Sequence, residues 1–322
     1  MRWRLHHKYG LAENCRGAFQ QGFTLVEILV SMAIMAILFG TMMPLMDKVW
    51  LSSEKSDTRQ KMADLKRAMV GDQRMVQNGI RMHYGFVGDY GVLPSVISDL
   101  VIEPTWVVSG IWQGPYLVGA FDMKDYYNDA WHRQLVYTTY PPDAPLEVTY
   151  HVEGHPDVIL KFAATLKSLG PDGLAGTADD LDENTDPELQ ILTSEVWPTN
   201  KVQGNLDYVV TAAAPNPGPD VFARLYVNYK GPIGDEVVFS GCSRLVVGEL
   251  VAGEPKRVRQ TLEIMDLLLP VGRDVVGSHI YTDADCTEPH IDTQANEAAA
   301  YVSDGLSTLS VNLPTVNYSY AP

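Results

Sequence analysis

Residues 22–35 read GFTLVEILVSMAIM, and the apolar run that they open continues to Met46. Between Phe23 and Met46 there are 24 residues with a single charge, Glu27. A helix of about 20 apolar residues is enough to cross a bilayer, so the run predicts a transmembrane helix over residues 23–46. A carboxylate inside hydrocarbon is costly, and Glu27 therefore needs an explanation of its own.

Basic residues before the run predict its orientation. Residues 1–22 carry one acid, Glu13, and four basic residues, which are Arg2, Arg4, Lys8 and Arg16. The positive-inside rule keeps this end in the cytoplasm and places the rest of the chain outside the inner membrane, in the periplasm. The net charge of −16 argues against nucleic acid as a partner, and without residues 1–22 (Lys+Arg 24 − 4, Asp+Glu 40 − 1) it becomes −19.

Two simpler explanations fit the apolar run less well. A secretory signal peptide has a shorter apolar core and an A-x-A-like cleavage site after it, and no such site follows here. A plain membrane anchor gives no account of Glu27. Gly22 stands before the run, where a protease could remove the basic leader alone.

The stretch GFTLVEILVSMAIM resembles the N-terminal signature of type IV prepilins and pseudopilins. The resemblance implies that a prepilin peptidase cuts between Gly22 and Phe23 and methylates the new amine, leaving N-methylphenylalanine. That amine lies four residues from the carboxylate of Glu27, so the two charges can neutralise each other within a subunit or between neighbouring subunits. Breaking a buried pair of this kind costs about 3–5 kcal/mol.

The helical pattern continues beyond the membrane segment. Residues 47–80 are charged on one side and place apolar residues at helical spacing on the other: Met62, Leu65, Met69, Val76 and Ile80. We expect one long helix whose second, amphipathic half is covered by a globular head, with a kink or locally melted turn at Pro44. An independent amphipathic helix is the alternative.

Residues 81–186 predict a small α/β head. The segments WQGPYLVG (112–119) and DAWHRQLVYTTY (129–140) resemble the head of the major pseudopilin of type II secretion. That family has Asp-Pro-Trp-Gly where this chain has Asp129-Ala130-Trp131-His132, so the geometry of this turn is open. The resemblance implies a type IV pilin fold, with the long helix packed on an antiparallel sheet.

An acidic, glycine-rich loop follows at residues 167–186, KSLGPDGLAGTADDLDENTD. By itself it could be a solvated acidic loop or a site for Ca²⁺, which prefers oxygen ligands. The pattern resembles the calcium loop of the major pseudopilins. Carried over, the implied ligands of one Ca²⁺ are the side chains of Asp172, Asp179 and Asp180 and the backbone oxygens of Leu169 and Thr177.

Residues 187–322 exceed what that family explains. Short runs rich in Val, Tyr, Leu and Phe predict an antiparallel, sandwich-like β-domain, at 205–214, 221–231, 235–241, 244–253, 258–270 and 305–320. Removing the leader with Cys15 leaves Cys242 and Cys286, which could form a disulfide or remain two unrelated thiols.

The sequence offers little for catalysis. It has no G-x-S-x-G elbow, P-loop or H-E-x-x-H motif, and His151, Glu153 and His155 on one face of a strand are only a weak zinc signal. We therefore expect a structural subunit rather than an enzyme, polymerising through its helix into a type II secretion or type IV pilus-like filament. Its partners would be other pilin or pseudopilin subunits, the prepilin peptidase and the inner-membrane assembly platform.

A second hypothesis is a minor pilin at the filament tip, whose β-domain binds a ligand, a surface or secretion cargo. A bulky extension is easier to accommodate at an end than along a repeating shaft. Glu27 favours the shaft, since the family's tip subunits can lack that glutamate.

Overall fold

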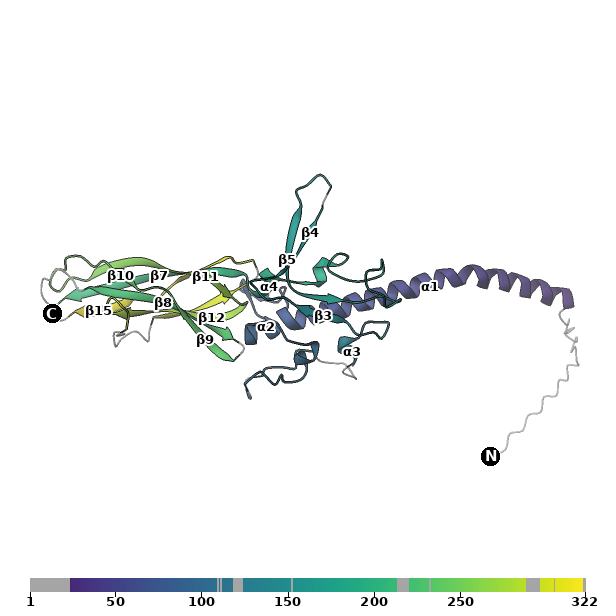
Figure 1. Cartoon of the computed structure of the whole chain (residues 1–322), viewed down its shortest axis with the longest axis horizontal. Helices are drawn as coiled ribbons and strands as arrows, with labels where there is room; N and C mark the ends of the chain where they lie inside the picture. The colour runs from purple at the N-terminus through teal and green to yellow at the C-terminus, as the bar shows by residue number, and fades with distance from the viewer. Residues whose placement is uncertain are drawn as a thin grey trace, which may run out of the picture. The chain divides into compact units, whose positions relative to one another are not determined.

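The computed structural model describes residues 24–108, 110, 112–117, 124–151, 153–212, 220–231, 233–287, 296–303 and 305–320 (Figure 1). Its contacts divide the chain into two units, residues 1–52 and 53–322. The architecture is α+β, with one long N-terminal helix and many antiparallel strands. The first unit consists, in its described part, of the beginning of that helix.

Helix α1 (Leu25–Val70) runs for 46 residues. The helix continues through Pro44, where the sequence predicted a kink or melted turn. A proline removes its own backbone donor, but the hydrogen bonds of flanking residues can maintain the helix around it. In the second unit the predicted apolar face is buried at Met62, Leu65 and Met69, each at most 2% exposed. Complete burial of such a side chain contributes about 1.5–3 kcal/mol.

The helix ends at Val70, ten residues before the predicted end at Ile80. Gly71 has φ +86, and a Cβ at this position would lie 2.2 Å from the carbonyl oxygen of His83. Glycine allows both the left-handed conformation and this close approach. The chain then forms a short antiparallel hairpin, β1 (Val76–Gln77) and β2 (Ile80–Arg81), so the apolar spacing of Val76 and Ile80 does not belong to a helix.

The head contains α2 (Gly85–Tyr90), η1 (Ile97–Leu100), α3 (Lys124–Tyr127) and a small sheet. In this sheet β5 (Val158–Lys167) pairs antiparallel with β3 (Val136–Thr139), β4 (Leu146–Tyr150) and β6 (Ile191–Leu192). The turn η2 (Pro187–Leu189) comes directly before β6, and the short helix α4 (Thr193–Val196) follows β6. Ile191 and Val196 are fully buried in the same core as Met62 and Leu65, so the head extends about ten residues beyond the expected limit at 186.

The C-terminal domain has two sheets around a separate core. One sheet has the order β10 (Ser243–Leu245), β8 (Val221–Gly231), β12 (Gly272–Tyr281), β13 (Glu297–Val302), and β9 (Gly234–Phe239) also pairs with β8. The other places β7 (Thr199–Ala212) between β11 (Lys256–Leu269) on one side and β14 (Thr308–Asn312) and β15 (Val316–Tyr320) on the other. Side chains from both sheets share one apolar cluster, which includes Leu206, Tyr208, Leu225, Val276 and Ile280.

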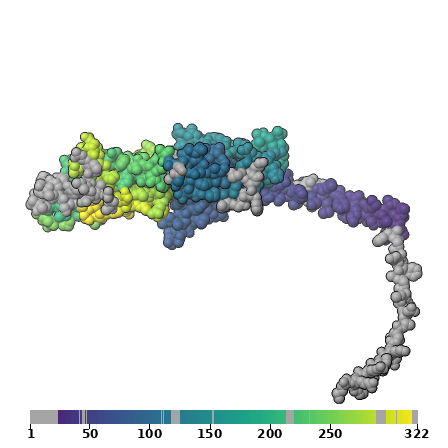
Figure 2. All heavy atoms as spheres, turned by 90° about the horizontal axis from the view of Figure 1, so that it is seen from below, coloured from purple at the N-terminus to yellow at the C-terminus, as the bar shows by residue number. Residues whose placement is uncertain are grey.

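This domain differs from the predicted one in two ways. Strands β14 and β15 run parallel to β7, so the domain is not purely antiparallel. In Figure 2 the yellow atoms of the C-terminal part of the chain lie beside green atoms from earlier in the chain. Strands β12 and β13 were not among the predicted runs. The sequence of β13, EAAAYV, is rich in alanine, which has a low strand propensity; its pairing with β12 and the burial of Ala300 and Val302 in the domain core favour the strand.

Candidate functional site

Gly22 and Phe23, the predicted processing site, lie outside the described residues. The described chain begins at Thr24, whose hydroxyl accepts a hydrogen bond from the backbone N–H of Glu27 at 3.2 Å. Thr24 therefore caps the helix, and Glu27 stands three residues later, where an acid interacts favourably with the helix dipole. The T-x-x-E spacing of residues 24–27 is the sequence signal for this cap, and it was not among the predictions.

Apolar side chains of the first unit are exposed on the part of α1 from Leu25 to Leu51. The exposed fractions are 76% for Leu25, 63% for Phe39 and 67% for Trp50. Within the part of the chain that the structure describes, no helix satisfies both the length and the mean hydropathy that crossing a membrane requires.

The acidic loop is closed at its base by two backbone hydrogen bonds between Ser168 and Leu181, of 2.9 and 3.0 Å. Within it, the carboxylates of Asp172, Asp179 and Asp180 lie around one hydroxyl group. Thr177 Oγ1 lies 3.5, 2.7 and 3.3 Å from an oxygen of these three side chains, respectively. The predicted side-chain ligands are thus brought to one side of the loop.

Close packing holds the loop in this form. Gly170 has φ +61, and a Cβ there would lie 2.6 Å from Asp179 Oδ2, so no larger residue fits without moving the carboxylate. The N–H of Gly176 donates to Asp180 Oδ2 at 2.7 Å, and Asp180 is only 1% exposed. The hydrogen bond from Thr177 is the main cause that lowers the pKa of Asp179 below its ordinary value.

The other acids of the segment have different partners. Asp186 forms a 2.6 Å ion pair with Arg59 of α1, and Lys167 lies 3.5 Å from Asp182 and 3.8 Å from Glu183. These acids anchor the loop to the head, which leaves the three around Thr177 as the candidate ligand group.

The donor set around Thr177 suits a hard cation, because all of its groups are oxygens. Among the described residues, however, no three His, Cys, Asp or Glu side chains lie close enough together to hold a metal ion as they stand. The Thr177 hydroxyl occupies the centre of the carboxylate group, so a cation would have to displace it. The oxygen chemistry fits Ca²⁺, and the coordination would require the loop to adjust.

The three residues that gave a weak zinc signal in the sequence do not lie on a strand. His151, Glu153 and His155 belong to the connection between β4 and β5, and His151 Nδ1 lies 2.8 Å from Asp157 Oδ1 with both side chains largely exposed. The alternation of polar residues here comes from a turn, which ends the strand at Tyr150.

Cys242 and Cys286 are joined by a disulfide, with their Cα atoms 5.9 Å apart. The bond connects the segment between β9 and β10 to the segment after β12, across 44 residues of sequence. It therefore closes a long loop within one sheet of the C-terminal domain.

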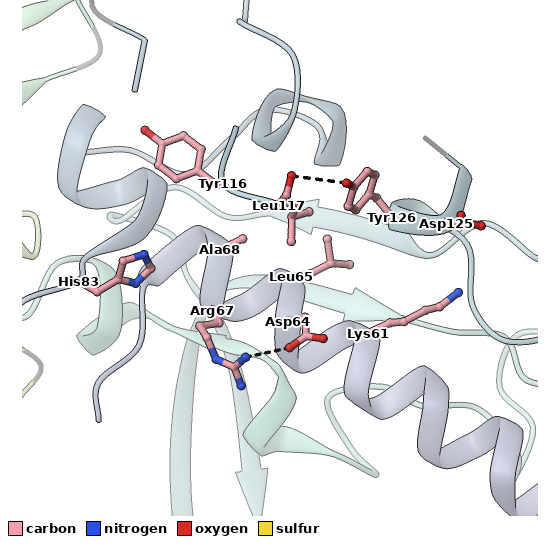
Figure 3. A pocket seen from close by; sticks show the side chains of 10 residues that line it. All are labelled: Lys61, Asp64, Leu65, Arg67, Ala68, His83, Tyr116, Leu117, Asp125 and Tyr126. Atoms are coloured by element: carbon pink, nitrogen blue, oxygen red, sulfur yellow. Dashed lines mark hydrogen bonds and ion pairs between the residues drawn. The ribbon is translucent and has the colours of Figure 1, made fainter. Parts of the chain in front are cut away.

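A cavity of about 470 Å³ lies beside the second half of α1 (Figure 3). Its polar side chains already interact with other protein groups. Arg67 forms a 2.9 Å ion pair with Asp64, Lys61 donates to the carbonyl of Asn128 at 3.1 Å, and His83 Nδ1 accepts from the N–H of Asp72 at 3.0 Å. These contacts make the cavity part of the packing between helix and head rather than a set of convergent groups for a ligand.

Comparison with known proteins finds a similarity at the N-terminus. Residues 18–43 match the family described as "Prokaryotic N-terminal methylation motif". No curated protein and no solved structure matches the chain. The matched residues include the sequence GFTLVE and the first turns of α1, and the motif is the prepilin type. The N-terminus of this chain therefore carries a prepilin-type methylation motif.

Proposed function

We propose that this protein is a structural subunit of a type II secretion or type IV pilus-like filament. The prepilin peptidase would cut between Gly22 and Phe23 and methylate Phe23, and the helix from Phe23 would anchor the subunit in the inner membrane with its C-terminal parts in the periplasm. The methylation motif over residues 18–43 carries this proposal. The exposed apolar side chains from Leu25 to Leu51 support it, because such a surface requires lipid or other helices around it.

Intact-mass measurement of the membrane-extracted protein tests the processing step. The expected mass is that of residues 23–322 plus one methyl group. A protein that keeps residues 1–22 would contradict the proposal, and a Gly22→Ala variant provides the unprocessed reference.

Glu27 is proposed to neutralise the amine of Phe23 during assembly, and the structure offers a competing local role for it at the start of α1. The substitution Glu27→Gln removes the charge and keeps a side chain that can hydrogen-bond at this position of a capped helix, so it separates the role of the charge from a hydrogen-bonding role at the cap. We expect Glu27→Gln to reduce filament yield in sheared surface fractions as strongly as Glu27→Ala. Normal assembly of Glu27→Gln with failure of Glu27→Ala would assign Glu27 to the helix cap.

Calcium binding to the acidic loop is a further part of the proposal. Asp172, Asp179 and Asp180 would supply side-chain oxygens, and Leu169 and Thr177 would supply backbone oxygens. Binding to the native state alone raises stability by mass action, by about 2.7 kcal/mol at a calcium concentration 100 times Kd. The protein should therefore melt at a higher temperature in CaCl₂ than in EDTA.

The double variant Asp179→Ala/Asp180→Ala should lose this calcium-dependent rise. Asp182 and Asp186 are unsuitable as controls because they anchor the loop, so exposed Asp143→Ala serves instead. If calcium does not raise the melting temperature of the parent protein, the calcium assignment is wrong.

Placement at the filament tip is the second candidate function. The C-terminal domain has its own apolar core, separate from the core of the head, so it can be carried as an added module. Counting copies relative to other pilins in sheared fractions distinguishes the two positions. Many copies per filament would contradict the tip position.

A further inference from the structure

The outer face of the sheet formed by β11, β7, β14 and β15 contains a polar cavity. Its volume is about 490 Å³, within the range of small-ligand sites. The polar residues that line it come from three strands: Asn205, Asp207, Arg259, Gln260, Thr261 and Asn312. Leu206 and Leu313 also border it, but at 2% and 5% exposure they offer a ligand little apolar surface.

An interruption in the sheet explains the hollow. Asn312 of β14 is opposite Asn205, and Val316 of β15 is opposite Tyr208. Residues 313–315, between β14 and β15, thus lie opposite only two residues of β7, Leu206 and Asp207. Pro314, in the middle of the three, has no backbone N–H and cannot continue the ladder.

The side chains around the hollow are held in place by one another. Thr261 Oγ1 donates to Asn205 Oδ1 at 2.8 Å, and Asn205 Nδ2 donates to Asn312 Oδ1 at 3.0 Å. After these bonds the Asn205 amide keeps one donor hydrogen and one acceptor lone pair, and within the described part of the chain the Asn312 amide nitrogen donates to no protein group. These three side chains are therefore held in place by one another and still have hydrogen-bonding groups available for a ligand.

Charged side chains lie next to these polar side chains at one end of the cavity. Asp207 is 3.1 Å from Arg257 Nε and 3.9 Å from Arg259 Nε, and the Arg259 side chain is 72% exposed. The second distance is too long for a strong hydrogen bond, so most of the donor capacity of Arg259 remains available. The cavity thus presents amide, hydroxyl, carboxylate and guanidinium groups together.

This combination excludes several classes of ligand. An apolar molecule would find too little apolar wall, and a divalent cation would find a single carboxylate, Asp207. A phosphate would find a single cationic side chain in the lining, Arg259, because Arg257 pairs with Asp207 and does not line the cavity. An extended peptide would add to the edge of a strand, whereas this cavity lies on the face of the sheet over β7, which has neighbours on both sides.

A polyhydroxylated molecule fits the same groups. Each sugar hydroxyl both donates and accepts a hydrogen bond, and neighbouring hydroxyls match a carboxylate or a primary amide, which present two polar atoms side by side. We propose that the cavity at Asn205, Asp207, Thr261 and Asn312 binds a neutral saccharide. The proposal goes beyond filament assembly and does not depend on it.

The test uses the full chain, solubilised in a detergent without a sugar headgroup, on an array of neutral oligosaccharides built from glucose, mannose, galactose and N-acetylglucosamine. Sulfated and phosphorylated versions of the same oligosaccharides are included. We expect retention on at least one neutral oligosaccharide and competition by the same oligosaccharide in solution. Retention on the charged versions alone, or on none, would overturn the saccharide site and leave the filament proposal untouched.

Two variants locate the site. Asn312→Ala removes the distal amide, and Thr261→Phe fills the cavity from an exposed position, so each should weaken binding at least tenfold. The matched control is Asn317→Ala, an exposed asparagine on β15 that does not line the cavity. Binding that survives both cavity variants, or falls equally in the control, would overturn the assignment. Unchanged melting temperatures show that a loss of binding is not a loss of fold.

Discussion

Ser168 Oγ donates a hydrogen bond of 2.7 Å to Asp129 Oδ2, and both residues are buried. The other oxygen of Asp129 accepts from the backbone N–H of Arg133 at 2.8 Å. One carboxylate thus joins the turn before β3 to the base of the acidic loop. The order of the loop therefore depends on a residue about 40 positions earlier in the sequence.

We expect Asp129→Ala to destabilise the head. Two donors would be left without their acceptor, and a hydrogen bond to a charged group contributes about 1.5–3 kcal/mol. Urea unfolding of the full chain measures the change, with exposed Asp143→Ala as control. Equal midpoints for the two variants would show that the link does not stabilise the fold.

His132 occupies a backbone conformation that favours glycine. Its φ is +63, in the turn where the resembling family has glycine. A left-handed residue with a side chain is strained by roughly 1–2 kcal/mol, although histidine tolerates it better than most. His132→Gly should therefore keep or raise the melting temperature, and His132→Val should lower it. The reverse order would mean that the histidine side chain, rather than φ, decides stability here.

Local patterns explain which parts of the fold the sequence predicted. The apolar run and its helical spacing up to Met69 are local signals, and α1 follows them. The same spacing at Val76 and Ile80 is misleading, because Gly71 and the approach of His83 end the helix first. The fate of those positions depends on a contact that the local pattern does not contain.

Strand direction and the candidate sites depend on non-local contacts. Parallel and antiparallel strands show the same alternation, so nothing in residues 305–320 indicates that β14 and β15 run parallel to β7. The resemblance to the pseudopilin calcium loop implied Asp172, Asp179 and Asp180 as a group, and these three lie within nine residues of one another. The cavity at Asn205 and Asn312 joins residues over a hundred positions apart, and only the fold brings them together.

The disulfide between Cys242 and Cys286 should stabilise the C-terminal domain. A bond across a loop of this length restricts the unfolded chain and contributes about 2–5 kcal/mol. We expect the double variant Cys242→Ser/Cys286→Ser to unfold at lower urea concentration than the oxidised parent. Reduction with dithiothreitol should lower the parent's midpoint to that of the variant and leave the variant unchanged. An unchanged parent would contradict a stabilising disulfide.

The buried carboxyl of Asp274 should make the stability of the C-terminal domain depend on pH. The residue lies on the inward side of β12 and is 2% exposed, and burial raises the pKa of its carboxyl to about 7. The folded state therefore holds this proton more tightly than the unfolded chain, where the group titrates near its ordinary 3.8. The contribution of this carboxyl to the stability of the folded state is fully present below about pH 4 and decreases as the pH rises towards 7.

Asp274→Asn replaces the acid by a neutral side chain of the same shape. We expect the variant to be more stable than the parent at pH 8 by a few kcal/mol, with a difference that narrows towards pH 4. Urea unfolding of both proteins across this range measures the difference, and other titrating groups cancel because they are common to both. Exposed Asp143→Asn provides the control and should show a nearly constant difference. A difference between Asp274→Asn and parent that does not change with pH would mean that the carboxylate is ionised and accommodated in the folded domain.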